Sequence, residues 1–135
     1  MLRLRHIADG VPDAPLLLLY GRDREAIARI VGCMRRLAAR EVVLTRMTDI
    51  PGVVSADGTD IALVIGISDE GAFRGGEGAF NWVLTGQSWD DIAELLMPFA
   101  EADGGGTMHQ RLSPQTRLPD SALPVIVTTS PKGEW

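Results

Sequence analysis

Three polar side chains stand in two alternating segments of the sequence, where they could contact a small ligand. Asn81 lies in the alternating segment 80–85, while His109 and Arg111 stand two residues apart in the segment 107–112. Because alternate residues of a strand point to the same face, His109 and Arg111 share one face. If that face lines a groove, an imidazole, a guanidinium and an amide can bind a polar ligand. The alternative is a strand face that is simply solvated.

Acidic side chains form the second candidate site. They are Asp69, Glu70, Asp90, Asp91 and Glu94. Such carboxylates can perform acid–base chemistry, bind a hard cation or meet a basic protein, although near a helix start they often only complement the helix dipole. Charge is unevenly distributed, because residues 1–50 sum to +3 and residues 51–135 to −8, within a total of −5. This polarity favours a surface that meets a charged partner.

No motif in the chain specifies a reaction, a cofactor or a metal. A single glycine, Gly21, follows the second predicted strand, whereas nucleotide-binding loops need several spaced glycines or a Gly-Lys-Ser/Thr sequence. Metal-ligand spacings such as HxH, HExxH and CxxC are missing from the sequence. Cys33 fits a half-buried structural role better than a reactive one, although arginines are near it. We therefore predict no cofactor, no metal site and no catalytic residues, and lean away from an enzyme.

Composition limits the class of protein further. A chain of 135 residues with 45% hydrophobic and 23% charged residues matches a single globular domain, 1–135. A pI near 4.9 argues against a general nucleic-acid-binding protein. The sequence has one cysteine, its first ten residues lack the apolar core of a signal peptide, and its longest apolar run is short. We expect a cytoplasmic protein without a membrane segment.

Hydrophobic periodicity predicts an α+β fold. Strands are expected at 2–7, 15–20, 41–47, 61–67, 80–85, 107–112 and 125–129. The first helix should begin after Asp23, and its flanking strands should form a βαβ unit. The second should begin at Ser88 in a capping box and be distorted or ended early by Pro98. We expect both helices on one face of a mixed or antiparallel sheet of about five to seven strands, with a ferredoxin-like topology open.

Three segments are expected outside regular structure. They are a glycine-rich mobile loop at 68–78, a proline-containing loop at 113–123 and a tail at 131–135, which ends in Trp135. Trp82 and Trp89 are expected to anchor the core. A homodimer is open, because edge strands such as 2–7 or 125–129 would offer unpaired backbone groups.

Two hypotheses of function follow. The first is a non-enzymatic interaction module, inhibitor-like or immunity-like, that presents the acidic surface to a basic protein. The alternative is a small-ligand binder or enzyme with its groove near Asn81, His109 and Arg111. We favour the first, because the sequence concentrates negative charge and carries no catalytic set.

Overall fold

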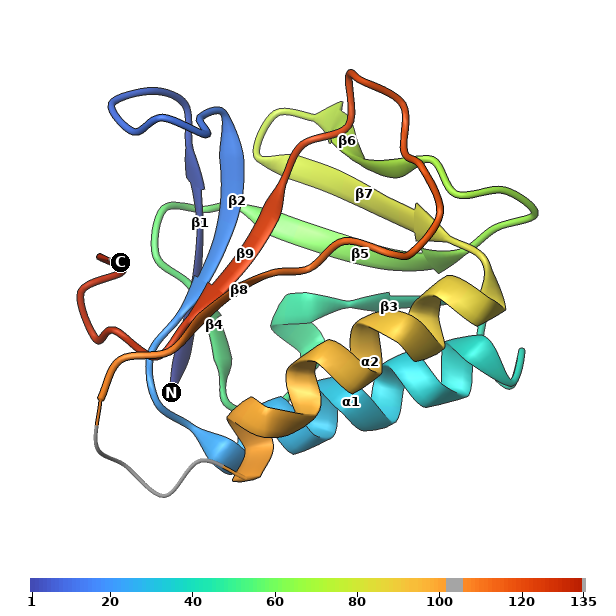
Figure 1. The fold of residues 1–135 in the computed structure, drawn as a ribbon, viewed down its shortest axis with the longest axis horizontal. Helices are drawn as coiled ribbons and strands as arrows, with labels where there is room; N and C mark the ends of the chain where they lie inside the picture. Colours follow the sequence, from blue (N-terminus) through green and yellow to red (C-terminus); the bar gives the residue numbers. More distant parts are fainter. Residues whose placement is uncertain (102–105, 135) are drawn as a thin grey trace.

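The computed structural model describes residues 1–101 and 106–134 (Figure 1). The prediction about Trp135 falls outside these residues. Within them the chain forms two α-helices and nine strands, which are divided between mixed sheets of five and four strands. The α+β class is confirmed, but the strands form two sheets instead of the single sheet of five to seven that we expected.

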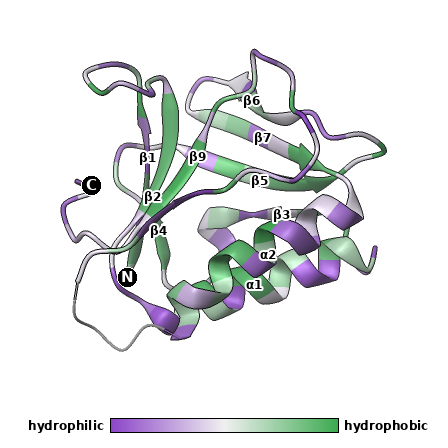
Figure 2. Cartoon of the chain, in the orientation of Figure 1, coloured by the Kyte–Doolittle hydropathy of each residue, from purple (hydrophilic) through white to green (hydrophobic). Residues whose placement is uncertain are grey.

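The five-stranded sheet, sheet A, has the order β4-β1-β2-β9-β8. Its strands are β1 (Leu2–Ile7), β2 (Leu16–Tyr20), β4 (Val53–Ser55), β8 (His109–Arg111) and β9 (Val125–Thr128). β2 is buried along its whole length and is largely green in Figure 2, as its sequence LLLLY predicts. β1 and β9 both lie inside the sheet, so the prediction that they offer free edges for a dimer is wrong. The short segments β4 and β8 cover those edges.

The four-stranded sheet, sheet B, has the order β3-β5-β7-β6. Its strands are β3 (Leu44–Arg46), β5 (Asp60–Ile65), β6 (Gly71–Gly76) and β7 (Ala79–Leu84), and a 3-10 turn, η1 (Met47–Asp49), follows β3. Residues 71–76 were expected in a loop, but they form strand β6. The backbone of this segment pairs antiparallel with β7, and such pairing does not need the side chains that glycine lacks.

Helix α1 (Arg24–Ala38) begins where the sequence predicts. The Asp23 carboxylate accepts a hydrogen bond from the Ala26 backbone N–H at 3.0 Å, which caps the first turn. This bond is the main cause that lowers the pKa of Asp23. The apolar stripe of α1 is buried from Ala26 to Leu37. However, β2 and β3, which flank α1, lie in different sheets, so the predicted βαβ unit does not form.

Helix α2 (Gly86–Glu101) begins three residues earlier than predicted, because its cap is Thr85 and not Ser88. The Thr85 hydroxyl accepts a bond from the Ser88 N–H at 3.3 Å, so Thr85 caps the helix and Ser88 lies in its first turn. Pro98 does not end the helix, which continues to Glu101 while Phe99 remains buried. Packing of the apolar face therefore outweighs the backbone bond that proline removes.

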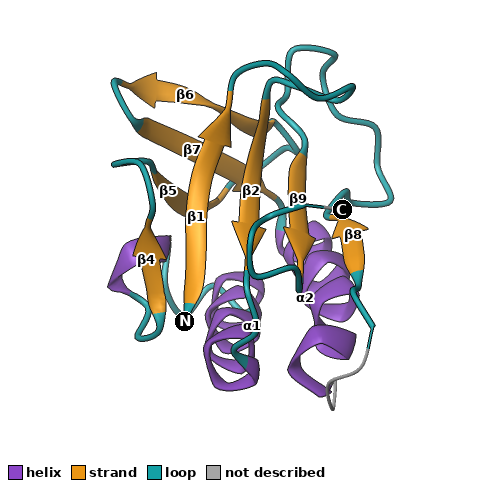
Figure 3. Ribbon diagram, turned by 90° about the vertical axis from the view of Figure 1, so that its left-hand side faces the viewer, coloured by secondary structure: helices purple, strands orange, loops and turns teal. Residues whose placement is uncertain are grey.

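The core lies between the two sheets and the helix pair. α1 and α2 lie side by side below the sheets in Figures 1 and 3. One apolar cluster combines the inner faces of both sheets with both helix stripes. Trp82 on β7 and Trp89 on α2 are buried at its centre, with ring centroids 5.1 Å apart and an angle of 68° between the ring planes. Their predicted core role is confirmed.

Candidate functional site

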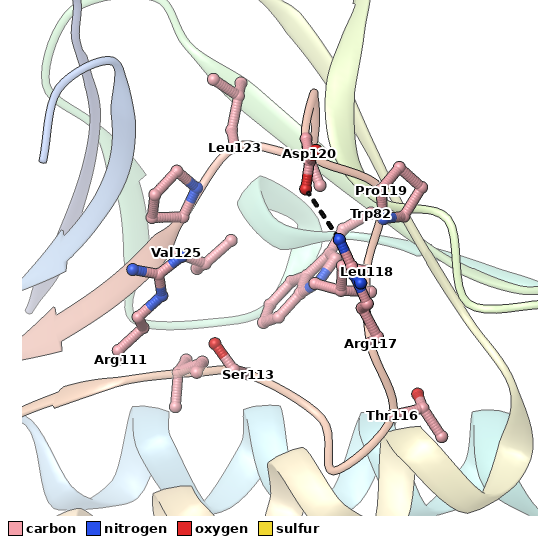
Figure 4. A pocket seen from close by; sticks show the side chains of 13 residues that line it. Trp82, Arg111, Ser113, Thr116, Arg117, Leu118, Pro119, Asp120, Leu123 and Val125 are labelled. Carbon is pink, nitrogen blue, oxygen red and sulfur yellow. Dashed lines mark ion pairs between the residues drawn. The ribbon is translucent and has the colours of Figure 1, made fainter.

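A pocket of about 350 Å³ opens between β8, β9 and the loop that joins them (Figure 4). The buried Trp82 ring lies at the back of the pocket, so the pocket reaches the centre of the core. Apolar walls come from Leu118, Leu123 and Val125. Its polar side chains are those of Arg111, Ser113, Thr116, Arg117 and Asp120. A small cavity with an aromatic floor and a few polar groups is typical of a ligand site.

The loop over the pocket, 113–124, is held at its two ends and at its middle. The Leu112 N–H donates to the Val125 carbonyl, and the Leu123 N–H donates to the Ala72 carbonyl, both at 2.8 Å. In the middle of the loop the Thr116 hydroxyl donates to the Asp69 carboxylate. The loop therefore bridges the edge of sheet A, strand β6 and the start of α2, which fixes the shape of the pocket.

The Asp69 carboxylate accepts hydrogen bonds from the start of α2 as well as from the loop 113–124. Its carboxylate also accepts bonds from the Thr85 N–H at 2.8 Å and from the Ser88 hydroxyl at 2.7 Å. Burial favours the neutral form of this acid, but the bonds from Thr116, Thr85 and Ser88 together outweigh burial and lower its pKa. Asp69 is one of the predicted partner-binding acids, and the structure places its carboxylate in an internal hydrogen-bond network.

Arg111 is an exposed cation at the pocket. The alternation of β8 exposes its side chain and half-buries that of Gln110. Among the described residues, no carboxylate or carbonyl pairs with the Arg111 guanidinium. Arg117 has a partner in Asp120, but at 3.7 Å and with both side chains about nine-tenths exposed (88% and 95%), this pair is weak. The pocket thus holds one unpaired and one loosely paired cation.

The three residues predicted to share a groove do not converge. Arg111 lines the pocket, whereas His109 is exposed on the same strand without lining it. Asn81 lies on β7, opposite Ala62 and Phe73, on the face of sheet B that is remote from the helices. Sequence alternation identifies faces of strands, but it does not tell which sheet a strand joins, and here the strands belong to different sheets.

The acids of α2 are largely engaged within the chain. Arg35 of α1 contacts Asp90 at 3.0 Å and Glu94 at 2.6 Å, and these hydrogen bonds raise the pKa of the arginine. Asp91 accepts a bond from the Gln87 amide at 3.3 Å. Glu70 is exposed. The positive and negative halves of the sequence therefore meet across the two helices, and this compensation is invisible in the linear charge balance.

Other chemistry-bearing groups add little to the site. Cys33 is buried, and its sulfur lies 3.4 Å from an Arg36 guanidinium nitrogen on the same helix. Among residues 1–101 and 106–134, no group of three His, Cys, Asp or Glu side chains is arranged to hold a metal ion. In the same ranges, neither helix has the length and apolar character needed to span a membrane.

Reasoning from sequence missed Ser113, Arg117 and Trp82 as parts of a pocket. The proline-rich loop 113–123 was a usable signal, because long structured loops often carry function. Protein-family models, curated proteins and solved structures were compared with the chain, and none matches it.

Proposed function

We propose that the protein binds a small organic carboxylate in the pocket below loop 113–124. The observation that carries this proposal is the unpaired Arg111 guanidinium beside a cavity whose floor is the Trp82 ring. The cation would bind the carboxylate, and Trp82 with the apolar walls would bind the body of the ligand. This develops the small-ligand hypothesis from Arg111 alone, without Asn81 and His109.

Arginine and carboxylate match in geometry as well as charge. The guanidinium presents parallel N–H donors to both carboxylate oxygens, and such charge-assisted bonds are stronger than neutral ones. The Ser113 hydroxyl lines the same pocket and offers a further donor. A volume of about 350 Å³ lies at the lower end of the range of ligand sites, which supports a compact acid instead of a nucleotide.

A carboxylate fits better than a phosphate because the pocket also contains an acid. Asp120 lines it, and Arg117 compensates this charge only loosely. A dianionic phosphate would be repelled by Asp120 more strongly than a monoanion. Phosphate sites also usually offer several backbone N–H groups at a helix N-terminus. In this pocket the floor is an indole ring instead.

Calorimetric titration with benzoate tests the proposal, with benzamide as the neutral analogue of the same shape and inorganic phosphate as a third probe. We expect benzoate to bind most tightly and Arg111→Ala to weaken it by about 10- to 100-fold, the value of one or two charge-assisted bonds. His109→Ala is the matched control on the same strand and should bind like the wild type. Equal binding of benzoate and benzamide would contradict the proposal.

A basic protein as partner of the acidic surface is a second proposal. It is supported by Glu94, whose side chain stays 70% exposed while it contacts Arg35. A polyarginine peptide is a suitable probe, because binding through exposed charges weakens as salt rises. The combined substitutions Asp90→Lys, Asp91→Lys and Glu94→Lys should abolish that binding at low salt. Undiminished binding by this triple variant would rule the proposal out.

A further inference from the structure

Strand β3 is an open edge of sheet B. The Ile65 N–H donates to the Val43 carbonyl at 3.1 Å, and the same register continues along Leu44, Thr45 and Arg46. In an antiparallel pair, bonded and non-bonded residues alternate, so the backbone groups of Thr45 point towards β5. Those of Leu44 and Arg46 point the other way, where no strand of the described ranges 1–101 and 106–134 lies beside β3. Their N–H and C=O groups can therefore pair with another chain.

A groove of about 620 Å³ runs beside this edge, between β3 and helix α1. Thr45 and the segment 49–51 line one side of the groove. The other side is one row of α1, with the spacing i, i+3, i+4 and i+7: Arg29, Gly32, Cys33 and Arg36. Thr45 thus points to the helix side of the sheet. A strand added to β3 would lay alternate side chains into the groove in the same way.

Gly32 keeps the groove open. It lies in the middle of α1, where glycine is less favourable than alanine. Its backbone is helical, and a Cβ at this position would meet no heavy atom within 4 Å. Neither backbone conformation nor crowding within the described chain therefore requires a glycine here. The bare helix surface instead allows the side chains of a bound peptide to approach α1 closely.

The charges of the groove favour an acidic occupant. Its lining holds two arginines and one aspartate, Asp49. Among the described residues, no carboxylate pairs with Arg36. Arg29 donates to the Pro51 carbonyl at 3.2 Å, and its ion pair with Glu25 is weak, at 3.6 Å and with the glutamate 85% exposed. Both guanidinium groups can therefore bind a carboxylate from outside the chain.

We propose that β3 pairs with an extended acidic peptide, whose alternate carboxylates bind Arg29 and Arg36 in the groove. Alternate residues of a strand are about 6.6 Å apart, and the two arginines are about 10.5 Å apart along α1, a difference that their long side chains can span. The residue between the two acids would lie on the opposite face beside Leu44, which is 48% exposed, so an apolar side chain fits there. Backbone pairing would supply affinity, and the groove would supply specificity.

A second copy of the chain matches this edge less well than an acidic peptide does. The helix-side residues of β3 and its approach are Val43 and Thr45. Two copies paired through β3 would place these side chains, and no carboxylate, against the arginines of the groove. The proposed peptide site is also separate from the pocket below loop 113–124, with which it shares no lining residue.

Fluorescence anisotropy with a labelled peptide of alternating valine and glutamate, VEVEV, tests the proposal. The control peptide VEEVV has the same composition with adjacent acids, and we expect it to bind about 10-fold more weakly. Arg36→Ala should weaken VEVEV by about 10-fold, and high salt should weaken it in the same direction. Arg3→Ala removes the same charge from an exposed position on the outer face of sheet A and should bind like the wild type. Saturating benzoate should leave the peptide bound.

Two further variants test the groove and the edge separately without a large risk to folding. Gly32→Leu fills the groove with a better helix former, so it should keep or raise the melting temperature while it weakens VEVEV by about 10-fold. Leu44→Pro removes an outward N–H that β5 does not use, whereas Leu44→Ala keeps it. Leu44→Pro should therefore bind VEVEV about 10-fold more weakly than Leu44→Ala.

Three results would overturn the proposal. The first is equal binding of VEVEV and VEEVV, or undiminished binding by Gly32→Leu. The second is a wild type that dimerises in sedimentation velocity and that Leu44→Pro makes monomeric, because a second copy would then occupy the edge. The third is displacement of VEVEV by benzoate, because the peptide would then bind in the pocket below loop 113–124, and the proposed carboxylate site would stand without this one.

Discussion

Two arginines of this protein have opposite surroundings. Arg35 lies between Asp90 and Glu94, with nitrogen–oxygen distances of 3.0 and 2.6 Å, and joins the two helices. Arg111 lines a pocket and has no charged partner among the described residues. The first charge is neutralised within the fold, whereas we propose that the second binds an anion from solution. The distinction rests on pairing, which the charge balance along the chain does not reveal.

Substitution of the pocket floor should have the largest effect on stability. Trp82→Ala removes a buried indole that packs against Trp89, and we expect a loss of about 3–5 kcal/mol in the free energy of unfolding. Urea denaturation followed by circular dichroism measures this loss. Arg111→Ala, in the same pocket but exposed, should change stability by less than about 0.5 kcal/mol. Similar losses for the two variants would mean that the Arg111 side chain is structural.

Substitution of the two arginines should affect benzoate binding differently. Arg111→Ala should reduce benzoate binding by about 1.5–3 kcal/mol, whereas Arg35→Met should leave benzoate affinity unchanged. Arg111→Lys keeps the charge but loses the planar pair of donors, so its affinity should fall between those of wild type and Arg111→Ala. Isothermal titration calorimetry measures all three. If Arg35→Met binds benzoate as weakly as Arg111→Ala does, the proposed difference between a structural arginine and a ligand-binding arginine is wrong.

Asp69 should stabilise the loop and helix in a pH-dependent way. Its pKa is lowered in the folded protein, so its contribution is complete above the ordinary value near 3.8 and is lost as pH falls through the folded pKa. At neutral pH, Asp69→Asn should destabilise the protein by about 1–2 kcal/mol, as the loss of a helix cap does. The difference between wild type and variant in urea denaturation should shrink as the pH falls below 3.8. A constant difference between pH 7 and pH 2.5 would contradict this role.

The Arg35 cluster should contribute least to stability. Its side chain is 38% exposed, and that of Glu94 is 70% exposed, so water and salt screen the pair. Arg35→Met should cost about 0–1 kcal/mol, and the cost should decrease in high salt. Thermal denaturation at low and high ionic strength measures it. A loss of several kcal/mol that does not change with salt would contradict this prediction, because it would show that water and salt do not screen the pair.

Local signals in the sequence predicted much of the fold. The Asp23 cap and the unbroken apolar stripe defined α1, and alternating or apolar runs identified most strands. β6 was missed because its glycines resemble a loop, and only its pairing with β7 makes it a strand. The division into two sheets was missed because a local pattern does not specify strand partners.

The site was only partly predictable for the same reason. Arg111 was identified from alternation, but the pocket depends on a contact between Thr116 and Asp69, which are 47 residues apart. The engagement of Asp90 and Glu94 depends on Arg35, which lies more than fifty residues away along the chain. Such long-range contacts decide which charges are free, and no spacing rule in the sequence supplies them.

The most direct test of the central claim is a nitrogen-15 NMR titration that follows the arginine Nε–H signals as benzoate is added. The account predicts that the Arg111 signal shifts and exchanges more slowly with water, because its guanidinium binds the carboxylate, while the Arg35 signal stays unchanged as an internal reference. An unshifted Arg111 signal at saturating benzoate, or equal shifts of both arginines, would contradict it.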